Sequence, residues 1–183
     1  MRRGYFGIGV EGVSKPMNVG NLLRSAHSFG ASFFFTVSPA VDVKSMAESD
    51  TSGAFDHIPF YNFQKPGDLI LPARASLVGV EFLEDAIELP SFRHPQCAVY
   101  VLGRERGNVS DEMLARCDYV IKIPMKFCIN VGVAGALVMY DRLISLGRFA
   151  DRPVHAGGPD GFSPQQLKEE QIISRIARHS QPK

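Results

Sequence analysis

The chain has 183 residues, of which 45% are apolar, and this is enough for one domain with a substantial core. Its 20 lysines and arginines nearly balance 19 aspartates and glutamates, so a net charge of +1 gives no general electrostatic reason to bind a nucleic acid. Any site for a polyanion must therefore be local.

Three cysteines, Cys97, Cys117 and Cys128, lie far apart and lack the spacing of metal ligands. An odd number cannot form a closed set of disulfides, which fits a reducing compartment. Residues 1–10 are broken by glycines and resemble a strand more than a signal peptide. The longest apolar run, residues 129–140, is shorter than the ~20 residues that span a bilayer. We therefore expect a soluble cytoplasmic protein with no metal site and no membrane partner.

The beginning of the chain predicts a strand, a helix and a second strand in succession. The apolar segments Tyr5–Val10 and Ser32–Val37 are typical of buried strands. Between them, Leu22–Phe29 places its apolar side chains on one face of a helix, and Gly30 follows as a C-terminal cap. Together the three segments predict a β-α-β unit.

Gly7, Gly9 and Gly12 spell the pattern G-x-G-x-x-G. In a dinucleotide-binding fold, this pattern turns directly into a helix and is followed by an acid about 20 residues further on. Here the glycines fall within the predicted strand, and Pro16 disfavours a helical conformation at Lys15. No acid stands at the required distance, so an oxidoreductase that binds a nicotinamide dinucleotide is only a rival hypothesis.

Strands and helices continue to alternate in the second half of the chain. Strands are predicted at residues 76–82, 98–102 and 119–123, which are rich in β-branched and aromatic side chains. A helix is predicted from Asn130 to a cap at Gly147. The alternation indicates an α/β fold with a largely parallel sheet flanked by helices.

The composition changes near the C-terminus. Residues 151–161 have the proline and glycine density of a linker, and Ser163 and Pro164 begin a final amphipathic helix. We therefore predict a main domain over residues 1–150, and a linker with a C-terminal amphipathic helix over residues 151–183. This helix is expected to dock on the main domain or on a second subunit rather than to contact RNA.

A first polar cluster, Asn18, Asn21 and Arg24, surrounds the start of the first predicted helix. Free backbone N–H groups at a helix start favour an anion, and an arginine there can bind a phosphate through two hydrogen bonds. The alternative is that one asparagine caps the helix while Arg24 is a solvated surface residue.

A second polar cluster follows the strand at residues 98–102. Gly103 allows a backbone to approach a ligand closely, at the end of a strand where α/β sheets bind ligands. Charged residues follow at positions 104–106. The alternative is an ordinary charged turn before a helix capped by Ser110.

A third cluster runs from Pro124 through a short loop to Asn130, which begins a helix. The helix is rich in small residues, which let another backbone come close, either within the fold or across a subunit interface. These small residues are Gly132, Ala134, Gly135 and Ala136. Ordinary tight packing would explain the glycines but not Asn130.

In this order, the clusters resemble the three signature motifs of the SPOUT superfamily, specifically the SpoU-type RNA ribose 2′-O-methyltransferases. The motifs correspond to NVGNLLR at residues 18–24, LGRERG at 102–107 and IPMKFCINV at 123–131. The resemblance spans roughly Tyr5 to Leu146. It implies a C-terminal trefoil knot, an exception to the rule that chains do not thread their own loops.

The resemblance also implies S-adenosylmethionine as the cofactor, bent among the knot loops and held largely by backbone groups. By position, the residues that bind it are Val80, Leu102, Gly103, Ile123, Met125, Cys128, Ile129 and Asn130. The family assigns activation of the ribose hydroxyl to the arginine matching Arg24, helped by Asn18, Glu105 and Asn130. Because a guanidinium hardly ever loses its proton, Arg24 could instead clamp a phosphate or stabilise the developing alkoxide, with water accepting the proton.

Cys128 stands where the family usually has serine. A thiol is a weaker hydrogen-bond donor, so either the backbone at 128 holds the cofactor or the activity is reduced; a nucleophilic Cys128 is a further alternative. The implied function is methylation of an RNA ribose 2′-hydroxyl, in tRNA ahead of rRNA, by a homodimer with a shared site. The alternative is a non-catalytic RNA-binding or dimerisation module that retains the fold.

Overall fold

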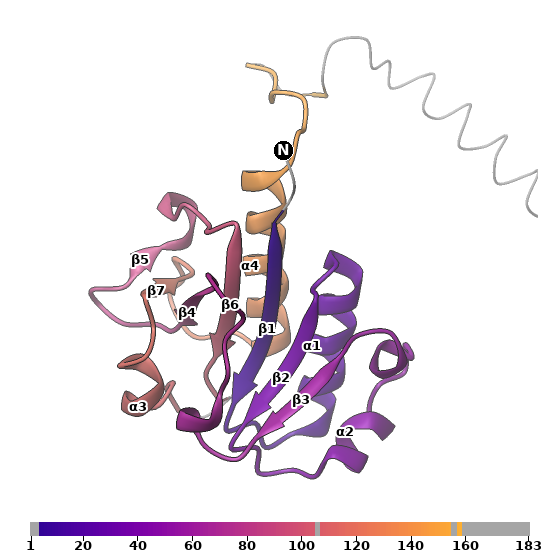
Figure 1. The fold of residues 1–183 in the computed structure, drawn as a ribbon. Helices are drawn as coiled ribbons and strands as arrows, with labels where there is room; N and C mark the ends of the chain where they lie inside the picture. The colour runs from indigo at the N-terminus through magenta and orange to yellow at the C-terminus, as the bar shows by residue number, and fades with distance from the viewer. Residues whose placement is uncertain (1–3, 105–106, 155–156, 159–183) are drawn as a thin grey trace, which may run out of the picture. The chain divides into compact units, whose positions relative to one another are not determined.

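The structure is a computed structural model that describes residues 4–104, 107–154 and 157–158. The chain divides after Gly147 into two units, Met1–Gly147 and Arg148–Lys183. All the helices and strands of the described residues lie in the first unit (Figure 1). The C-terminal helix predicted from Ser163 onward lies outside the described residues, so it stays a prediction.

In the part of the chain that the structure describes, seven strands form one sheet in the order β3-β2-β1-β6-β4-β7-β5, and every pairing is parallel. The α/β fold with a parallel sheet is therefore confirmed, and each of the strands predicted from the sequence is present. The strands are β1 (Tyr5–Glu11), β2 (Phe33–Val37), β3 (Phe60–Phe63), β4 (Ser76–Val80), β5 (Ile87–Glu88), β6 (Cys97–Leu102) and β7 (Tyr119–Lys122).

Helices cover one face of the sheet. The long helices α1 (Pro16–Phe29) and α4 (Val131–Leu146) lie side by side on it (Figure 1), and the short α2 (Val43–Glu48) packs against α1. A large apolar cluster joins these helices to the strands. Among the described residues, no helix is long and apolar enough to cross a bilayer.

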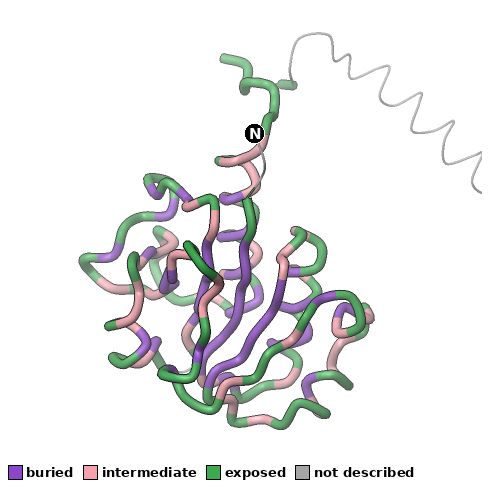
Figure 2. The backbone as a smooth tube through the Cα atoms, viewed as in Figure 1, coloured by how far each residue is buried: buried purple, intermediate pink, exposed green. Residues whose placement is uncertain are grey.

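The opposite face carries a smaller apolar cluster. It includes Met113 of the short helix α3 (Asp111–Leu114) and Leu69 from the segment between β3 and β4. Both clusters contain residues of β2, because successive side chains of a strand point to opposite faces of the sheet. Phe34 belongs to the large cluster, and Phe33 and Phe35 belong to the small one. Figure 2 shows how the buried residues follow the central strands, as expected for a parallel sheet that is packed on both faces.

The first helix begins earlier than the sequence analysis predicted. It starts at Pro16 rather than at Leu22, with Lys15 extended before it. Proline suits the first helical position, since no backbone N–H is needed there and its ring already fixes φ near the helical value. The helix thus follows the glycine pattern after a short loop at residues 13–15, and the extended Lys15 agrees with the expectation from Pro16. The first polar cluster lies inside the helix. Gly30 ends it as predicted, with a left-handed φ of 74°.

A polar cluster is buried between α4 and β6. Arg142 donates to the Tyr100 hydroxyl at 3.2 Å, and this hydroxyl lies 2.6 Å from Nδ1 of His94. Nε2 of His94 lies 3.0 Å from a carboxylate oxygen of Asp141. These contacts suit a neutral imidazole that accepts from Tyr100 and donates to Asp141. Burial lowers the pKa of His94, and this effect outweighs the neighbouring Asp141 carboxylate, which raises the pKa.

The shifted pKa of His94 predicts a loss of stability in mild acid. In the unfolded chain the imidazole takes up a proton near its usual pKa of 6.5, whereas in the folded protein burial disfavours the protonated form and lowers the pKa. Because the unfolded state then binds more protons, the contribution is complete above this pH and is lost as the pH falls toward the lower folded pKa. The free energy of unfolding, measured by urea denaturation between pH 8 and pH 5, should therefore fall with decreasing pH.

The variant His94→Gln is the control for this titration, since glutamine retains one donor and one acceptor but cannot take up a proton. It should be less stable than the wild type at pH 8 and should lose less stability on acidification. An identical pH dependence in the two proteins would show that His94 does not titrate as described.

Candidate functional site

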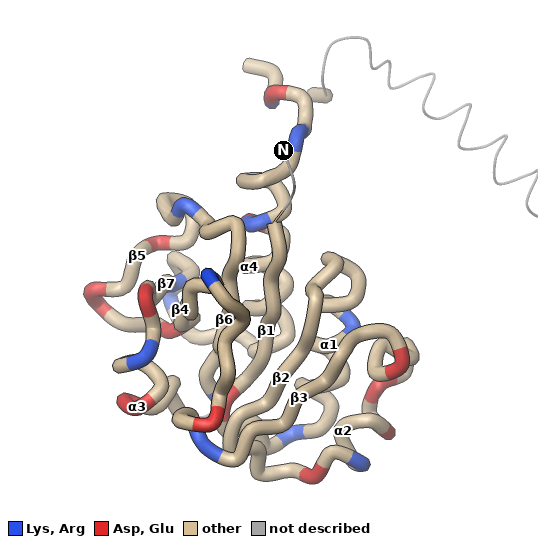
Figure 3. Tube along the Cα trace, in the orientation of Figure 1, with Lys and Arg blue, Asp and Glu red and all other residues tan. Residues whose placement is uncertain are grey.

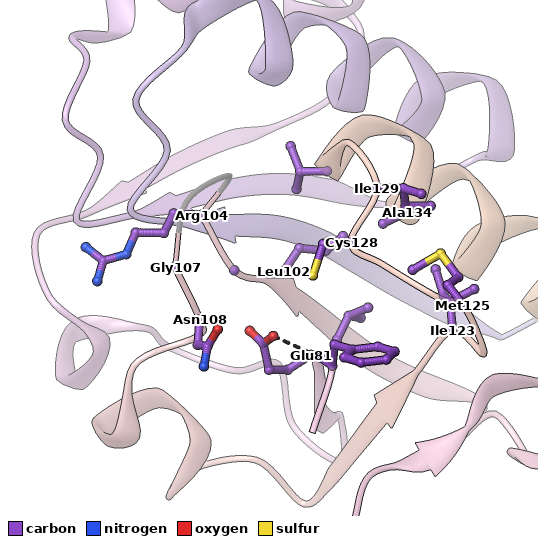
Figure 4. Close-up of a pocket in the computed structure, with 14 residues that line it drawn as sticks. Glu81, Leu102, Arg104, Gly107, Asn108, Ile123, Met125, Cys128, Ile129 and Ala134 are labelled. Atoms are coloured by element: carbon purple, nitrogen blue, oxygen red, sulfur yellow. Dashed lines mark hydrogen bonds between the residues drawn. The ribbon is translucent and has the colours of Figure 1, made fainter. Parts of the chain in front are cut away.

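A pocket opens at the carboxyl ends of β4, β6 and β7, which are neighbours in the sheet (Figure 4). Its walls come from the segments that follow these strands and from the start of α4. The space between the walls is about 750 Å³, including the part open to solvent. The position is the one at which α/β sheets bind ligands.

Most of the residues predicted to bind the cofactor line this pocket. They are Val80, Leu102, Gly103, Ile123, Met125, Cys128 and Ile129. Asn130 does not line it, although its chain neighbours Ile129 and Val131 do. The pocket also contains residues to which the sequence analysis gave no role in binding, namely Glu81, Phe82, Arg104, Gly107, Asn108, Val131 and Ala134. The structure thus brings the predicted set together, and its role in binding a cofactor stays a prediction.

Asn18 and Asn130 meet beside the pocket, although they are 112 positions apart. Nδ2 of Asn130 donates to Oδ1 of Asn18 at 2.9 Å, and Oδ1 of Asn130 accepts from the backbone N–H of Gly132 at 2.8 Å. The second bond caps α4 and fixes which end of the Asn130 amide carries the oxygen. The first and third sequence motifs are therefore joined by one hydrogen bond.

The glycines of α4 set how closely it approaches α1. A Cβ on Gly135 would lie 2.1 Å from Cδ1 of Leu22, and one on Gly132 would lie 3.2 Å from Cβ of Asn21. A side chain at position 135 would force Leu22 to shift, and one at position 132 would press against Asn21. The close packing that the small residues permit is therefore packing within the chain, which was one of the two alternatives.

The other two predicted catalytic residues are not placed in this group. Arg24 is exposed on α1 and does not line the pocket of its own chain. It forms no ion pair with any residue that the structure describes. Glu105 lies outside the described residues. The structure thus brings Asn18 and Asn130 together and leaves Arg24 apart from them.

Two carboxylates hold the segment that follows Gly103. Oε2 of Glu81 accepts from the backbone N–H of Val109 at 2.7 Å. Glu11, which is buried at the end of β1, accepts from the backbone N–H of Ser110 at 2.9 Å and from its hydroxyl at 2.6 Å. Since β1 and β4 lie on either side of β6, this segment is fixed from both neighbouring strands.

Cys128 is exposed on the loop before α4, and its sulfur points into the pocket (Figure 4). Its chain neighbour Ile129 and the more distant Leu102 add apolar walls. In the described residues, positions of both charge signs are interspersed along the chain (Figure 3). The pocket thus combines apolar side chains with the charged or polar residues Glu81, Arg104 and Asn108.

Comparisons with known proteins agree on one family. The model of the SpoU rRNA Methylase family matches residues 6–140. A 23S rRNA (uridine(2479)-2′-O)-methyltransferase from Streptomyces viridochromogenes is 27% identical over 169 residues, covering 84% of this chain and 58% of that protein. A tRNA (guanosine(18)-2′-O)-methyltransferase from Escherichia coli (strain K12) is 25% identical over 138 residues, covering 72% of this chain and 60% of that protein. The chain therefore spans less than two thirds of the length of these relatives.

Solved structures show the same fold. The SpoU methyltransferase AviRb from Streptomyces viridochromogenes, in complex with the cofactor AdoMet, is similar with a TM-score of 0.68 and 24% identity, over 79% of this chain and 61% of that chain. The TrmH/SpoU tRNA modifying enzyme from A. aeolicus is similar with a TM-score of 0.68 and 18% identity, over 97% of this chain and 90% of that chain. Because the family model covers most of the sequence, the chain belongs to the SpoU rRNA Methylase family.

Proposed function

We propose that this protein transfers a methyl group from S-adenosylmethionine to the 2′-hydroxyl of an RNA ribose. The observation that carries the proposal is the pocket at the ends of β4, β6 and β7, beside which Asn18 and Asn130 meet. Membership of the SpoU rRNA Methylase family supports the reaction, as do the names of the two 2′-O-methyltransferases to which the chain is similar.

The residues of the pocket fit this cofactor. Apolar side chains, among them Leu102, Ile123 and Ile129, suit the adenine ring and the methionine chain, while Gly103 leaves backbone groups accessible at the end of β6. When bound, the cofactor supplies a methyl group carried on a positively charged sulfur. The pocket would hold this sulfur in line with the acceptor hydroxyl, and such positioning accounts for much of the rate of a group transfer.

Arg24, Asn18, Asn130 and Glu105 are the proposed catalytic residues. The guanidinium of Arg24 would bind a phosphate of the RNA or stabilise the alkoxide as the hydroxyl loses its proton, with water accepting that proton. The Asn18–Asn130 pair would hold the start of α4, and with it one wall of the pocket, in a fixed position. Glu105 keeps its proposed role through the sequence motif alone.

We also propose a homodimer in which Arg24 serves the pocket of the partner. Arg24 is exposed and lies outside the pocket of its own chain, which supports delivery across an interface. Helix α4 also presents Val133, Leu137 and Tyr140, which are 52%, 41% and 50% exposed. Their spacing places them on one face of the helix, and such an apolar stripe is typical of an interaction surface.

For the substrate, we propose tRNA ahead of rRNA. Relatives of both kinds occur, since the Escherichia coli protein is named for tRNA and the Streptomyces protein for rRNA. The experiment therefore incubates the purified protein with methyl-labelled S-adenosylmethionine and with separate tRNA and rRNA pools. Modified nucleosides are then identified by mass spectrometry. Label should appear in 2′-O-methylated ribose of tRNA.

Two variants of Cys128 provide matched controls for the RNA experiment. Cys128→Trp should fill the pocket from an exposed position and abolish transfer, whereas Cys128→Ala should retain it if the backbone at 128 holds the cofactor. Label confined to bases would contradict the proposed reaction. Cofactor binding by the wild type without transfer to any RNA would instead support a non-catalytic module.

A mixed dimer tests whether the site is shared. One chain carries Arg24→Ala and the other carries Cys128→Trp, and each homodimer should be inactive. If Arg24 acts on the partner's pocket, one site of the mixed dimer has both defects and the other has none. About half of the wild-type methyl transfer should then return, assuming independent sites.

The mixed dimer is purified with two different affinity tags, and circular dichroism confirms that it is folded. If Arg24 instead served its own chain, each site would keep one defect. A folded mixed dimer without recovered methyl transfer would therefore contradict the shared site.

A further inference from the structure

Glu81 lines the pocket, although it belongs to none of the three sequence motifs. It follows β4 directly, and its backbone N–H donates to the carbonyl of Ile121 in β7 at 2.9 Å. Its partly buried side chain reaches across the pocket toward the segment that carries Asn108 (Figure 4). A carboxylate is therefore held inside the pocket, at the carboxyl edge of the sheet.

The carboxylate of Glu81 accepts hydrogen bonds from two backbone groups. Oε2 accepts from Val109 at 2.7 Å, and Oε1 accepts from Phe82 at 2.8 Å. An ionised carboxylate can accept about four hydrogen bonds. Among the described residues, no lysine or arginine forms an ion pair with Glu81. Each oxygen can therefore accept one more hydrogen bond, and the matching ligand group must be a donor.

Gly103 leaves the space that this carboxylate occupies. A Cβ at position 103 would lie 2.9 Å from Oε2 of Glu81 and 2.8 Å from the backbone nitrogen of Val109. Any side chain there would displace the carboxylate or break its bond to Val109. Since the oxygens are already fixed, binding a ligand to them costs little conformational entropy of the protein.

A ribose diol matches this arrangement of acceptors. Two hydroxyls on adjacent carbons can each donate to one oxygen of a carboxylate, and an acid near a strand end plays this role toward ribose in dinucleotide sites. Phe82 lines the same pocket and is 47% exposed, so it offers an aromatic face on which an attached base can stack. A carboxylate and an aromatic ring next to each other in sequence are thus suited to the two halves of a nucleoside.

We propose that Glu81 binds the 2′- and 3′-hydroxyls of an adenosine ligand in this pocket and so selects ribonucleosides over their deoxy forms. The inference rests on the proposed function, because it places the nucleoside part of the cofactor here. It adds a specificity-determining residue that the sequence motifs do not contain.

Calorimetric titrations with three ligands test this role. The ligands are S-adenosylhomocysteine, its 2′,3′-dideoxy analogue, and 5′-methylthioadenosine, which keeps the diol but lacks the amino acid. Glu81→Gln should weaken binding of the two diol ligands about tenfold or more, as expected when hydrogen bonds to a charged group are lost. The dideoxy analogue should bind weakly to the wild type and equally weakly to the variant.

Glu11→Gln is the matched control, since Glu11 holds the same segment through Ser110 but does not line the pocket. It should affect the three ligands equally. If Glu81→Gln weakened binding of the dideoxy analogue as much as binding of the diol ligands, Glu81 would only hold the segment in place. If the variant weakened binding of S-adenosylhomocysteine but not of 5′-methylthioadenosine, Glu81 would bind the amino group of the amino-acid part. Either result, or no loss at all, contradicts the inference. If the wild type binds none of the ligands, the proposed function fails with it.

Discussion

The close contact between α1 and α4 is the constraint on which the candidate site depends. Gly132 and Gly135 bring the two helices within reach of each other, because any larger side chain would meet Asn21 or Leu22. At this separation Asn18 can bond Asn130, the residue that caps α4. The first turns of α4 form one wall of the pocket, so the helix contact also sets the position of that wall.

The parallel sheet supplies the second requirement. In a parallel sheet all carboxyl ends lie at one edge, so segments distant in sequence leave β4, β6 and β7 at the same place. Carboxylates from the two strands beside β6 then fix the segment after Gly103. The pocket therefore consists of loops whose positions are set by strands and by buried hydrogen bonds, as a binding site with little ordering cost requires.

Much of this fold could be predicted from the sequence, because the central strands are apolar runs rich in β-branched and aromatic residues. The elements β3, β5 and α2 could not be predicted, because they are four, two and six residues long and give too short a pattern to recognise. The start of α1 was predicted too late because the apolar face by which the helix was recognised begins at Leu22, whereas the helix itself begins at Pro16.

The site was predictable only in part, and by a different route. No periodicity connects Asn18 with Asn130, which are 112 positions apart, so their proximity was suggested by the family resemblance. Glu81 was missed because a single acid after a strand carries no pattern by itself. Its position in the pocket follows from the structure, in which β4 pairs with β6 and the Glu81 carboxylate accepts a hydrogen bond from Val109.

The most direct test of this account is a crystal structure of the protein grown with S-adenosylhomocysteine. The account predicts electron density for the ligand between the ends of β4, β6 and β7, in contact with Gly103 and Ile129. Density for the ligand at any other place on the chain, with this pocket filled only by solvent, would contradict it.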